Sequence, residues 1–332
     1  MKLAILGSGM IVRDFLSIAD EIPGLVLAAI FGQESTRPEL ERLQAEHGIG
    51  KVYVDYDACL ADPEIDTVYV GLPNGLHFEF ARRALEAGKH VICEKPFTLN
   101  LDELRQLRAI AEKNSLILVE AITTLYLANY AAIRERVAAL GRIRLIQCEY
   151  SQFSSRYPAF QAGEVLPAFD PARGGGALMD IGIYTLHFVA GLFGRPKSIT
   201  YTANVERGVD TSGIAVLAYD DFSAVCICAK DSGGPIRTKI QGEDGAIVMT
   251  GTPNSARGGF TLALRGEDPE TIDAQAHPHR MIGEFRAFAA MIRDRDLAAR
   301  DRSLDHSELV LELAGTALES AGIRLGPAPA GA

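Results

Sequence analysis

Short apolar runs and longer amphipathic stretches alternate through the first third of the chain. The runs have the length of strands and lie at residues 3–6, 25–31, 52–54, 67–70, 90–93 and 116–119. The stretches between them repeat apolar residues at helical spacing and lie at residues 10–20, 38–47, 76–87 and 101–113. Strands and helices that alternate in this way form right-handed crossovers around a parallel sheet. The pattern predicts a doubly wound α/β domain over residues 1–121.

The rhythm changes after residue 121. Helical patterns lie at residues 129–140, 177–192, 281–293 and 303–322, and strand-like runs lie at 143–153, 199–205, 214–219, 224–229, 238–241, 246–249 and 260–264. Turn residues separate the later runs, and no helix of crossover length lies between them, which favours antiparallel pairing. We therefore expect an α+β domain over residues 122–325, followed by a frayed tail at residues 326–332.

Composition and charge narrow the functional classes. A chain of 332 residues with 48% hydrophobic and 23% charged residues is typical of two globular domains. The net charge of -10 argues against nucleic acid and anionic membranes as partners. Five cysteines scattered through apolar segments are typical of reduced core residues rather than of a disulfide scaffold. The apolar run at the N-terminus ends at Gly7, which is short for a signal peptide, and no stretch approaches about 18 uninterrupted apolar residues, so we expect a cytoplasmic protein.

A glycine-containing turn follows the first predicted strand and opens the first predicted helix. It reads Gly7-Ser8-Gly9-Met10-Ile11. Glycine at position 7 permits a tight turn, and glycine at position 9 lets the backbone approach a pyrophosphate whose charge is met by the helix N-terminal N–H groups. The third small residue of the full dinucleotide fingerprint is missing, because Val12 stands there. The turn indicates dinucleotide binding, with a bare strand-to-helix turn as the weaker alternative.

The end of the second predicted strand bears on the choice of dinucleotide. A carboxylate there binds the adenosine ribose of NAD, and a basic residue accepts the phosphate of NADP. Gly32 occupies the strand tip, Gln33 follows, and Arg37 lies a few residues on. No carboxylate holds the ribose position unless Glu34 bends back to it. The pattern favours NADP slightly over NAD.

A lysine follows the fifth predicted strand in the segment His90-Val91-Ile92-Cys93-Glu94-Lys95-Pro96. Ligands of doubly wound sheets bind at the carboxyl ends of the strands, so Lys95 is expected to face the ligand crevice. Pro96 fixes the chain direction after it and is a candidate for a cis bond. A surface lysine after an edge strand is the alternative.

The predicted helix after Gly174-Gly175-Gly176 carries three polar side chains on one face. At about 100° per residue, Asp180, Tyr184 and His187 fall within a stripe of roughly 60°. A polar stripe is more often a solvated face, but such faces usually carry Lys, Glu and Arg, which are absent here. The helix therefore presents a carboxylate, a phenol and an imidazole as candidate site residues.

These segments together resemble the glucose–fructose oxidoreductase/inositol dehydrogenase/rhizopine catabolism (Gfo/Idh/MocA) family. The resemblance rests on four motifs, which are GSGM at the N-terminus, LPNGLH at residues 72–77, HVICEKP at residues 90–96 and GGGALMDIGIYTLH at residues 174–187. It implies a Rossmann domain followed by an open-faced antiparallel sheet that often forms an oligomer interface. It also implies NAD(P)-dependent chemistry on sugars, cyclic polyols or related alcohols.

The resemblance carries roles onto particular residues. Lys95 is similar to the lysine of the family's Glu-Lys-Pro motif, with Glu94 beside it, and Asp180 is similar to its active-site aspartate. Tyr184 stands where inositol-dehydrogenase-like members have histidine, as in members that resemble glucose–fructose oxidoreductase and dihydrodiol dehydrogenase. His187 is then either a substrate contact or a helix-packing residue. Leu72, Pro73, Asn74 and His77 resemble the segment that lines the cofactor.

The hypothesis that follows is hydride transfer between a nicotinamide and a CH–OH or C=O carbon, with Tyr184 exchanging the hydroxyl proton. A free tyrosine has a pKa of about 10, too high for a base at neutral pH. A lysine ammonium about 4 Å away is worth about 4 kcal/mol at an effective dielectric of about 20, and burial opposes the resulting fall in pKa. Lys95 and Asp180 are expected to assist in this way.

Several alternatives stay open. The non-enzymatic alternative is a catalytically silent dinucleotide-sensing regulator of the same fold. The alternative enzyme activity is that of a trans-dihydrodiol dehydrogenase. Arg156 and Tyr157 are candidate substrate contacts. The alternative is that their polar groups only keep the loop in contact with solvent. Cys226 and Cys228, and His277 with His279, have metal-compatible spacings but no suitable partners, so we expect no metal. We expect a small-molecule substrate and a homo-oligomer, dimer or tetramer, formed through the C-terminal sheet.

Overall fold

The computed structural model describes residues 1–326 of the chain. Two compact units make up these residues. The first contains Met1–Ala121 and Met281–Glu308, and the second contains Ile122–Arg280 and the residues from Leu309 onward. Apart from Gly326, the tail that we expect to fray lies outside the described residues.

The first unit is built on a six-stranded sheet in which all neighbouring strands are parallel. Its strands are β1 (Lys2–Leu6), β2 (Val26–Phe31), β3 (Lys51–Tyr53), β4 (Thr67–Val70), β5 (His90–Glu94) and β6 (Leu118–Ala121). They follow the order β3-β2-β1-β4-β5-β6. This order confirms the doubly wound fold, whose ligand site lies where the strand order reverses, beside the ends of β1 and β4.

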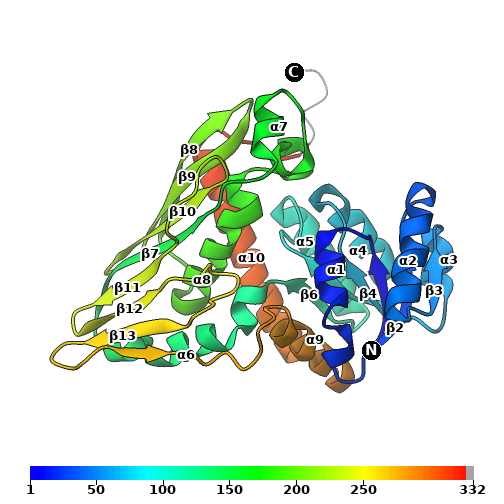
Figure 1. Cartoon of the computed structure of the whole chain (residues 1–332), viewed down its shortest axis with the longest axis horizontal. Coiled ribbons are helices and arrows are strands. Elements are labelled where there is room, and N and C mark those ends of the chain that lie inside the picture. The colour runs from blue at the N-terminus through cyan, green and yellow to red at the C-terminus, as the bar shows by residue number, and fades with distance from the viewer. Residues whose placement is uncertain (327–332) are drawn as a thin grey trace. The chain divides into compact units, whose positions relative to one another are not determined.

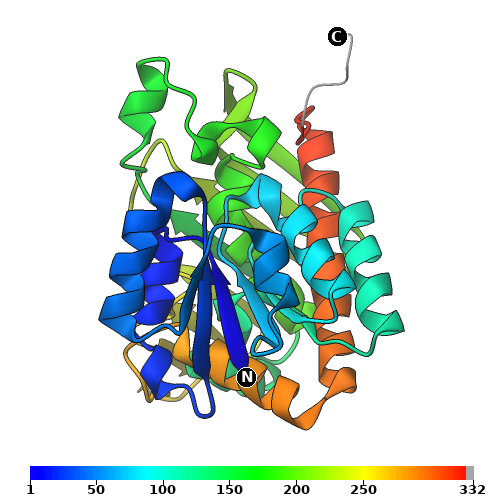
Figure 2. The same cartoon turned by 90° about the vertical axis from the view of Figure 1, so that its right-hand side faces the viewer.

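Helices cover both faces of this sheet (Figures 1 and 2). They are α1 (Met10–Leu16), α2 (Arg37–His47), α3 (Tyr56–Ala61), α4 (His77–Glu86) and α5 (Leu101–Lys113). Because both faces are covered, β4 is buried along its whole length and β1 is buried after its first residue. Helix α3 is absent from our sequence prediction. It is short, and its first turn is stabilised by Asp55, whose side chain accepts hydrogen bonds from the amides of Asp57 and Ala58.

Residues 281–308 belong to the first unit, which corrects the expected domain of residues 122–325. Helix α9 (Ile282–Asp294) places Phe285 against Phe15 and Tyr69, with ring centroids 4.3 Å and 5.2 Å apart. Helix α10 (Leu297–Ser320) then places Arg300 next to the end of α5, where its guanidinium donates to the carbonyl of Leu116 at 3.0 Å. Apolar periodicity predicts that these helices are amphipathic, but it does not predict which sheet their apolar faces cover.

The second unit is built on an eight-stranded sheet of order β14-β13-β12-β11-β7-β10-β9-β8. The strands are β7 (Ile143–Ser151), β8 (Ser198–Glu206), β9 (Val209–Ala218), β10 (Ser223–Ala229), β11 (Thr238–Gly242), β12 (Gly245–Met249), β13 (Phe260–Leu264) and β14 (Glu270–Ile272). Every neighbouring pair is antiparallel except β7 and β10, which are parallel. The expected mostly antiparallel sheet is confirmed.

Helices cover one face of this sheet and leave the other open (Figure 1). Helix α8 (Ile183–Phe193) packs against β7 and β10, and α6 (Ala128–Arg136) and the short α7 (Tyr157–Gln161) complete the unit. Buried and exposed residues alternate along β9, where Ala215 and Leu217 point inward while Ile214 and Val216 point to the open face. This alternation is typical of a sheet with one covered face.

The sequence predicts a regular helix from residue 177. In the structure, a π-helical turn at Leu178–Gly182 leads directly into α8. The whole stretch Pro171–Phe193 has the length and apolar composition of a membrane-crossing helix, and 72% of its most apolar window is buried inside the protein. The core helix of a globular unit has the same properties.

Candidate active site

The turn after β1 shows why glycine stands at positions 7 and 9. Gly7 has a φ of +103°, and a Cβ atom there would lie 2.8 Å from the carbonyl oxygen of Gly71. Gly9 has an ordinary φ of -73° and caps α1, and a Cβ atom there would meet nothing within 4 Å. Position 7 therefore needs glycine for the protein backbone, whereas position 9 leaves open space beside the first turn of α1.

Val12 occupies the place of the missing third small residue and is fully buried. A Cβ atom on Gly71 would lie 2.7 Å from the Cγ2 atom of Val12. The close approach of α1 to the sheet is thus achieved by a glycine at the end of β4 instead of one in the helix. Ser8, Met10 and Ile11 form the rest of the turn, and the Met10 side chain is largely exposed.

The tip of β2 carries an exposed ion pair. Gly32 is buried, and the position is tight for any larger residue, because a Cβ atom there would lie 2.8 Å from Oγ1 of Thr36. Gln33 is exposed, and Arg37 donates to both carboxylate oxygens of Glu34 at 2.7 Å and 2.8 Å. This hydrogen-bonded pair lowers the pKa of Glu34 and raises that of Arg37. Both charges stand beside the position where an adenosine ribose is held in this fold.

The segment after β4 is tied to the segment after β5 by His77. Its Nδ1 atom lies 2.9 Å from the carbonyl oxygen of Pro96, and its Nε2 atom lies 2.8 Å from that of Leu72. The ring is fully buried, and burial lowers the pKa of His77. His77 therefore lies behind the segment that is expected to line the cofactor, while Pro73 and Asn74 form the bend of that segment.

Lys95 directly follows β5, is half-buried, and is joined to Pro96 by a cis peptide bond. The neighbouring Glu94 is buried and accepts a hydrogen bond from the hydroxyl of Tyr69 at 2.7 Å. Glu94, at the end of the buried strand β5, is thus held by a hydrogen bond from the neighbouring strand β4.

A second carboxylate, Glu120 at the end of β6, lies behind the same segment. Its Oε1 atom accepts from the amide of Phe97 at 3.1 Å, and its Oε2 atom accepts from the hydroxyl of Ser307 at 2.7 Å. Glu120 is only 2% exposed, and burial raises its pKa to about 7. Glu94 raises this pKa further, and Lys95 lowers it. Sequence reasoning missed Glu120, although an acidic residue that ends an apolar strand is a visible signal.

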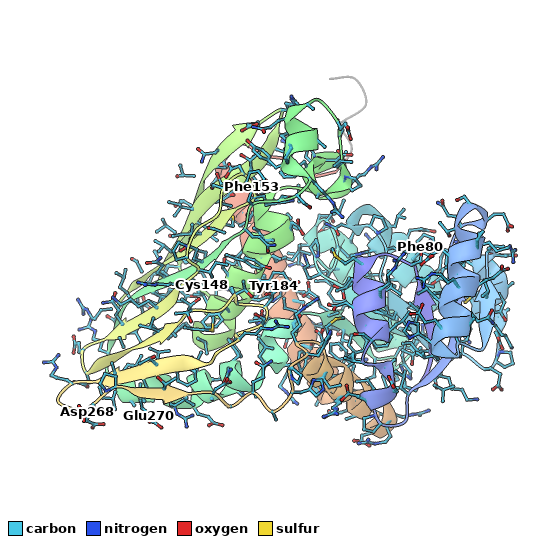
Figure 3. All side chains as sticks on the ribbon, in the orientation of Figure 1. Phe80, Cys148, Phe153, Tyr184, Asp268 and Glu270 are labelled. Atoms are coloured by element: carbon cyan, nitrogen blue, oxygen red, sulfur yellow. The ribbon has the colours of Figure 1, made fainter. Side chains whose placement is uncertain are left out.

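In the second unit, Asp180 and Tyr184 lie on successive turns at the start of the central helix. Figure 3 shows Tyr184 on the helix-covered side of the sheet. Its side chain is 6% exposed and its ring lies 5.9 Å from that of Tyr150. The Asp180 side chain is 34% exposed. His187 is fully buried, which favours the helix-packing alternative over a substrate contact.

Asp180 is paired with a lysine that the sequence did not single out. The Nζ atom of Lys230, the residue after β10, lies 2.8 Å from the Oδ2 atom of Asp180. Nearby, Asp210 of β9 accepts from the amide of Leu178 at 2.7 Å and from the hydroxyl of Tyr201 at 2.8 Å. The first turn of the helix is therefore fixed by a polar group on β9 and by one directly after β10.

Two of the three glycines before the helix, Gly175 and Gly176, are needed for close packing. Gly176 has a φ of +125°, and a Cβ atom there would collide with Oδ1 of Asp210. A Cβ atom on Gly175 would lie 2.5 Å from the carbonyl oxygen of Pro167. The glycine run thus lets the chain pass tightly under the preceding loop before the helix begins.

Arg156 and Tyr157, the candidate substrate contacts, have different surroundings. Arg156 is exposed at the start of α7. Tyr157 is buried in an aromatic cluster with Phe160 and Phe169, and its hydroxyl donates to Glu206 at 2.6 Å. The side chain of Tyr157 therefore packs within its own loop.

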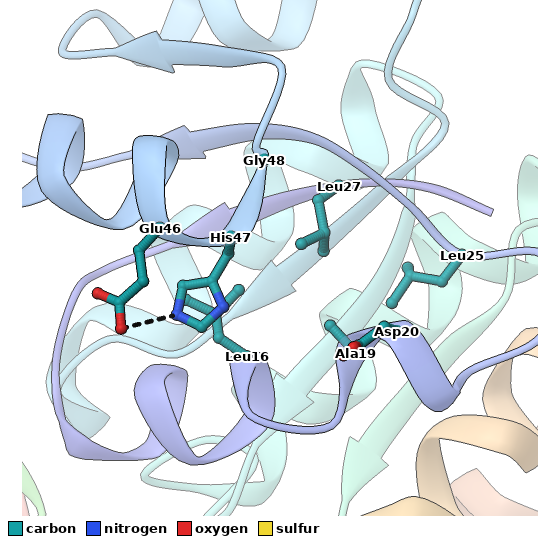
Figure 4. A pocket seen from close by; sticks show the side chains of 8 residues that line it. All are labelled: Leu16, Ala19, Asp20, Leu25, Leu27, Glu46, His47 and Gly48. Atoms are coloured by element: carbon teal, nitrogen blue, oxygen red, sulfur yellow. Dashed lines mark ion pairs between the residues drawn. The ribbon is translucent and has the colours of Figure 1, made fainter.

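A hollow of about 350 Å³ lies in the first unit at the end of the sheet opposite the glycine turn (Figure 4). Leu25 and Leu27, at the start of β2, line it together with His47 and Gly48, at the end of α2. Since ligands of doubly wound sheets bind at the carboxyl ends of the strands, this hollow is separate from the nucleotide site. Within residues 1–326, no group of three or more His, Cys, Asp or Glu side chains is arranged to hold a metal ion.

Comparison with known proteins decides the family. Residues 1–121 match the model of the oxidoreductase family with an NAD-binding Rossmann fold, and residues 130–248 match the GFO/IDH/MocA C-terminal domain. The chain belongs to the Gfo/Idh/MocA family. This Gfo/Idh/MocA protein is 32% identical to scyllo-inositol 2-dehydrogenase (NADP(+)) IolU of Bacillus subtilis, over 97% of its own length and 98% of that protein.

Two further similarities are more distant. Human trans-1,2-dihydrobenzene-1,2-diol dehydrogenase is 30% identical over 66% of this chain and 65% of its own. The crystal structure of KijD10, a 3-ketoreductase from Actinomadura kijaniata in complex with NADP and TDP-benzene, superimposes with a TM-score of 0.83 over 99% of both chains. At 22% identity this last match shows a common fold.

The first unit of this Gfo/Idh/MocA chain fits a nicotinamide dinucleotide. The open space beside Gly9 leaves room for a pyrophosphate to approach the backbone of the turn, whereas Gly7 is needed by the fold itself. Gln33 and the Glu34–Arg37 pair follow β2, where this fold would hold the ribose of such a ligand, and Lys95 follows β5 at the same edge of the sheet. The family's NAD(P)-binding function and the geometry of the turn agree.

Proposed function

We propose that the protein is an NAD(P)-dependent dehydrogenase or reductase that acts on a CH–OH or C=O carbon of a sugar, cyclic polyol or related alcohol. The single observation that carries the proposal is that Lys95, Asp180 and Tyr184 are all present in a chain of this family, each at the end or start of a buried element. A binding protein that does no chemistry has no need of all three.

In this proposal Tyr184 exchanges the hydroxyl proton of the substrate. A bound nicotinamide would supply the hydride acceptor for a carbinol carbon, or the hydride donor for a carbonyl carbon in the reverse direction. Loss of hydride must be matched by loss of the hydroxyl proton, which Tyr184 takes up during oxidation and returns during reduction. We assign Lys95 to assist Tyr184 through its positive charge, which would favour the ionised form of a phenol brought near it, and Asp180 to orient a second substrate hydroxyl.

The substrate class rests on the relatives and on the polar groups. The relatives named above act on an inositol and on a dihydrodiol, which both carry neighbouring hydroxyl groups on a six-membered ring. Asp180 and Tyr184, on successive helical turns, suit two neighbouring hydroxyls. We therefore place a cyclic polyol or sugar first and a trans-dihydrodiol second.

We propose NADP as the preferred dinucleotide. Arg37, the first residue of α2, is half-exposed, and its guanidinium, which is paired with Glu34, would turn to the 2′-phosphate when the dinucleotide binds. The B. subtilis relative carries NADP(+) in its name, which supports the same choice.

The test is a panel of inositols, sugars and trans-dihydrodiols assayed with NADP and NAD by the absorbance of the reduced nicotinamide. Tyr184→Phe, which removes one hydroxyl, is expected to lower kcat by about 10²–10⁴-fold while the dissociation constant of the dinucleotide stays unchanged. Lys95→Met is expected to abolish turnover with the dinucleotide still bound.

Tyr219→Phe is the matched control, because the hydroxyl of Tyr219 donates to the carbonyl of Gly194 at 3.0 Å, at the C-terminal end of α8 and so at the opposite end of that helix from Tyr184. Normal turnover by Tyr184→Phe would remove the proton-transfer role. Tight dinucleotide binding without turnover of any substrate in the panel would favour the silent regulator instead.

We further propose that two or more copies associate through the open face of the eight-stranded sheet. Leu145, Ile214 and Val216 are 45%, 45% and 41% exposed there, on strands close together in the sheet. Val225 and Ile227 of β10 stand opposite Val216 and Ile214 in the register, which extends the apolar patch. A patch of apolar residues on an open sheet face is typical of an interface.

A further inference from the structure

Lys230 is a buried lysine in the second unit. Its exposed fraction is 2%, although lysine is almost never fully buried unless its charge is paired. The main chain holds it firmly after β10, because its amide donates to Thr211 and its carbonyl accepts from the amide of Ser154, both at 2.8 Å. Its position is therefore fixed by β9 and by the loop before α7.

The ammonium of Lys230 meets three groups. It lies 2.8 Å from Oδ2 of Asp180, it donates to the carbonyl oxygen of Ala168 at 2.5 Å, and it stands 4.2 Å from the ring centroid of Phe169. Removing a charge from water is costly unless such partners replace the water. The energetic cost of burying this lysine is thus offset by contacts that include the candidate active-site carboxylate.

The same contacts connect the loop before the glycine run to the helix. The carbonyl of Ala168 also accepts from the amide of Gly176 at 3.1 Å, and the carbonyl of Gly176 accepts from the amide of Asp180 at 3.2 Å. Phe169 is anchored in the aromatic cluster with Tyr157 and Phe160. Lys230 therefore stands where the two ends of the segment from Ala168 to Asp180 come together.

We propose that Lys230 is a positioning residue for the reaction: it holds the Asp180 carboxylate ionised and in one orientation, and it joins the Ala168–Phe169 loop to that carboxylate. The inference rests on the function proposed above. The Asp180 side chain is 34% exposed and so accessible to a substrate hydroxyl, while its Oδ2 atom is held by the buried ammonium of Lys230. Asp210 has a different task, since its carboxylate binds the amide of Leu178 and the hydroxyl of Tyr201.

The kinetic test is a double-mutant cycle with Lys230→Met, Asp180→Asn and the double variant. If Lys230 acts through Asp180, Lys230→Met lowers kcat/KM for the substrate by about 10²-fold, and the double variant stays within about threefold of Asp180→Asn alone. Lys230→Arg keeps the charge and is expected to recover part of the loss. Lys197→Met, which removes an exposed ion pair with Asp220 in the same unit, is the control and is expected to be silent.

Turnover of Lys230→Met at the wild-type rate would overturn the proposal, and so would losses that multiply in the double variant. Amide hydrogen exchange of the full chain gives a readout independent of turnover. We expect residues 168–182 to exchange faster in Lys230→Met and at the wild-type rate in Lys197→Met. Unchanged exchange in Lys230→Met would overturn the joining of the loop to Asp180.

The two proposals fail in different ways. A wild-type protein that turns over no substrate refutes the proposed function, whereas the exchange measurement still decides whether Lys230 holds the loop. If Lys230→Met does not fold, the double variant, which leaves no unpaired carboxylate, provides the exchange measurement. A double variant that folds with wild-type exchange at residues 168–182 counts against the proposal.

Discussion

Glu120 is a carboxyl group with both oxygens hydrogen-bonded inside the first unit, next to the segment that carries Lys95. Its ordinary pKa is 4.5, and burial raises the pKa in the folded protein to about 7. The neutral form is thus favoured in the fold, and the unfolded chain releases the proton more readily. Stability from this group is fully present below about pH 4.5 and is lost as the pH rises through about 7.

Replacing Glu120 by glutamine removes this titration while keeping an acceptor for Phe97 and a partner for Ser307. We expect the free energy of unfolding of Glu120→Gln, relative to wild type, to rise between pH 5 and pH 8 by at most about 3 kcal/mol. Urea unfolding at several pH values measures it. Glu267→Gln, at an exposed position of the second unit, is the control and is expected to give parallel curves. Parallel curves for Glu120→Gln as well would show that Glu120 does not titrate with folding.

Residues that lie in a motif could be singled out from the sequence as site candidates, whereas the residues that contact them through space could not. Lys95, Asp180 and Tyr184 stand in recognisable segments with glycine or proline nearby. Lys230 and Ser307 stand in segments without any such pattern. Their roles depend on partners 50 and 187 positions away in the sequence, which only the packing of strands and helices brings into contact. Position in sequence carries no signal for contacts of this kind.

At the scale of elements, the parallel sheet was the easier part to predict. Its central strands are buried on both faces and read as continuous apolar runs, and four of its five crossover helices, all except α3, repeat apolar residues at helical spacing. The π-helical turn at Leu178–Gly182 could not be predicted, because helical periodicity assumes regular spacing. Strand β14, with three residues, is too short to show alternation.

The glycine turn between β1 and α1 allows two matched substitutions. Gly9→Ala places a methyl group in open space at an allowed φ, so we expect the stability to change by no more than about 0.5 kcal/mol. The dissociation constant of the dinucleotide should rise at least about tenfold, because the methyl group occupies the approach of the pyrophosphate.

Gly7→Ala is the contrasting variant in the same turn. It forces a side chain onto a φ of +103° and against the carbonyl of Gly71, so we expect a loss of about 1–3 kcal/mol of stability. Thermal unfolding and dinucleotide titration measure both variants. Wild-type affinity in Gly9→Ala would mean that the pyrophosphate does not approach the turn at this point.

For the whole molecule, the open face of the eight-stranded sheet makes association between copies testable. Ile214→Glu places a charge in the middle of the apolar patch, and we expect it to convert the oligomer to a monomer in sedimentation equilibrium. Val26→Glu is the control, since Val26 is an exposed apolar residue of the first unit with 53% of its surface accessible. A wild-type protein that is monomeric, or an Ile214→Glu variant of unchanged mass, would contradict association through this face.

The return of α9 and the first part of α10 to the first unit bears on how such proteins can be recombined. A gene fragment that ends at Ala121 would leave Phe15 and Tyr69 without Phe285, and Glu120 without Ser307. The nucleotide-binding unit consequently cannot be exchanged between relatives as one continuous segment. A chimera has to carry residues 281–308 together with residues 1–121.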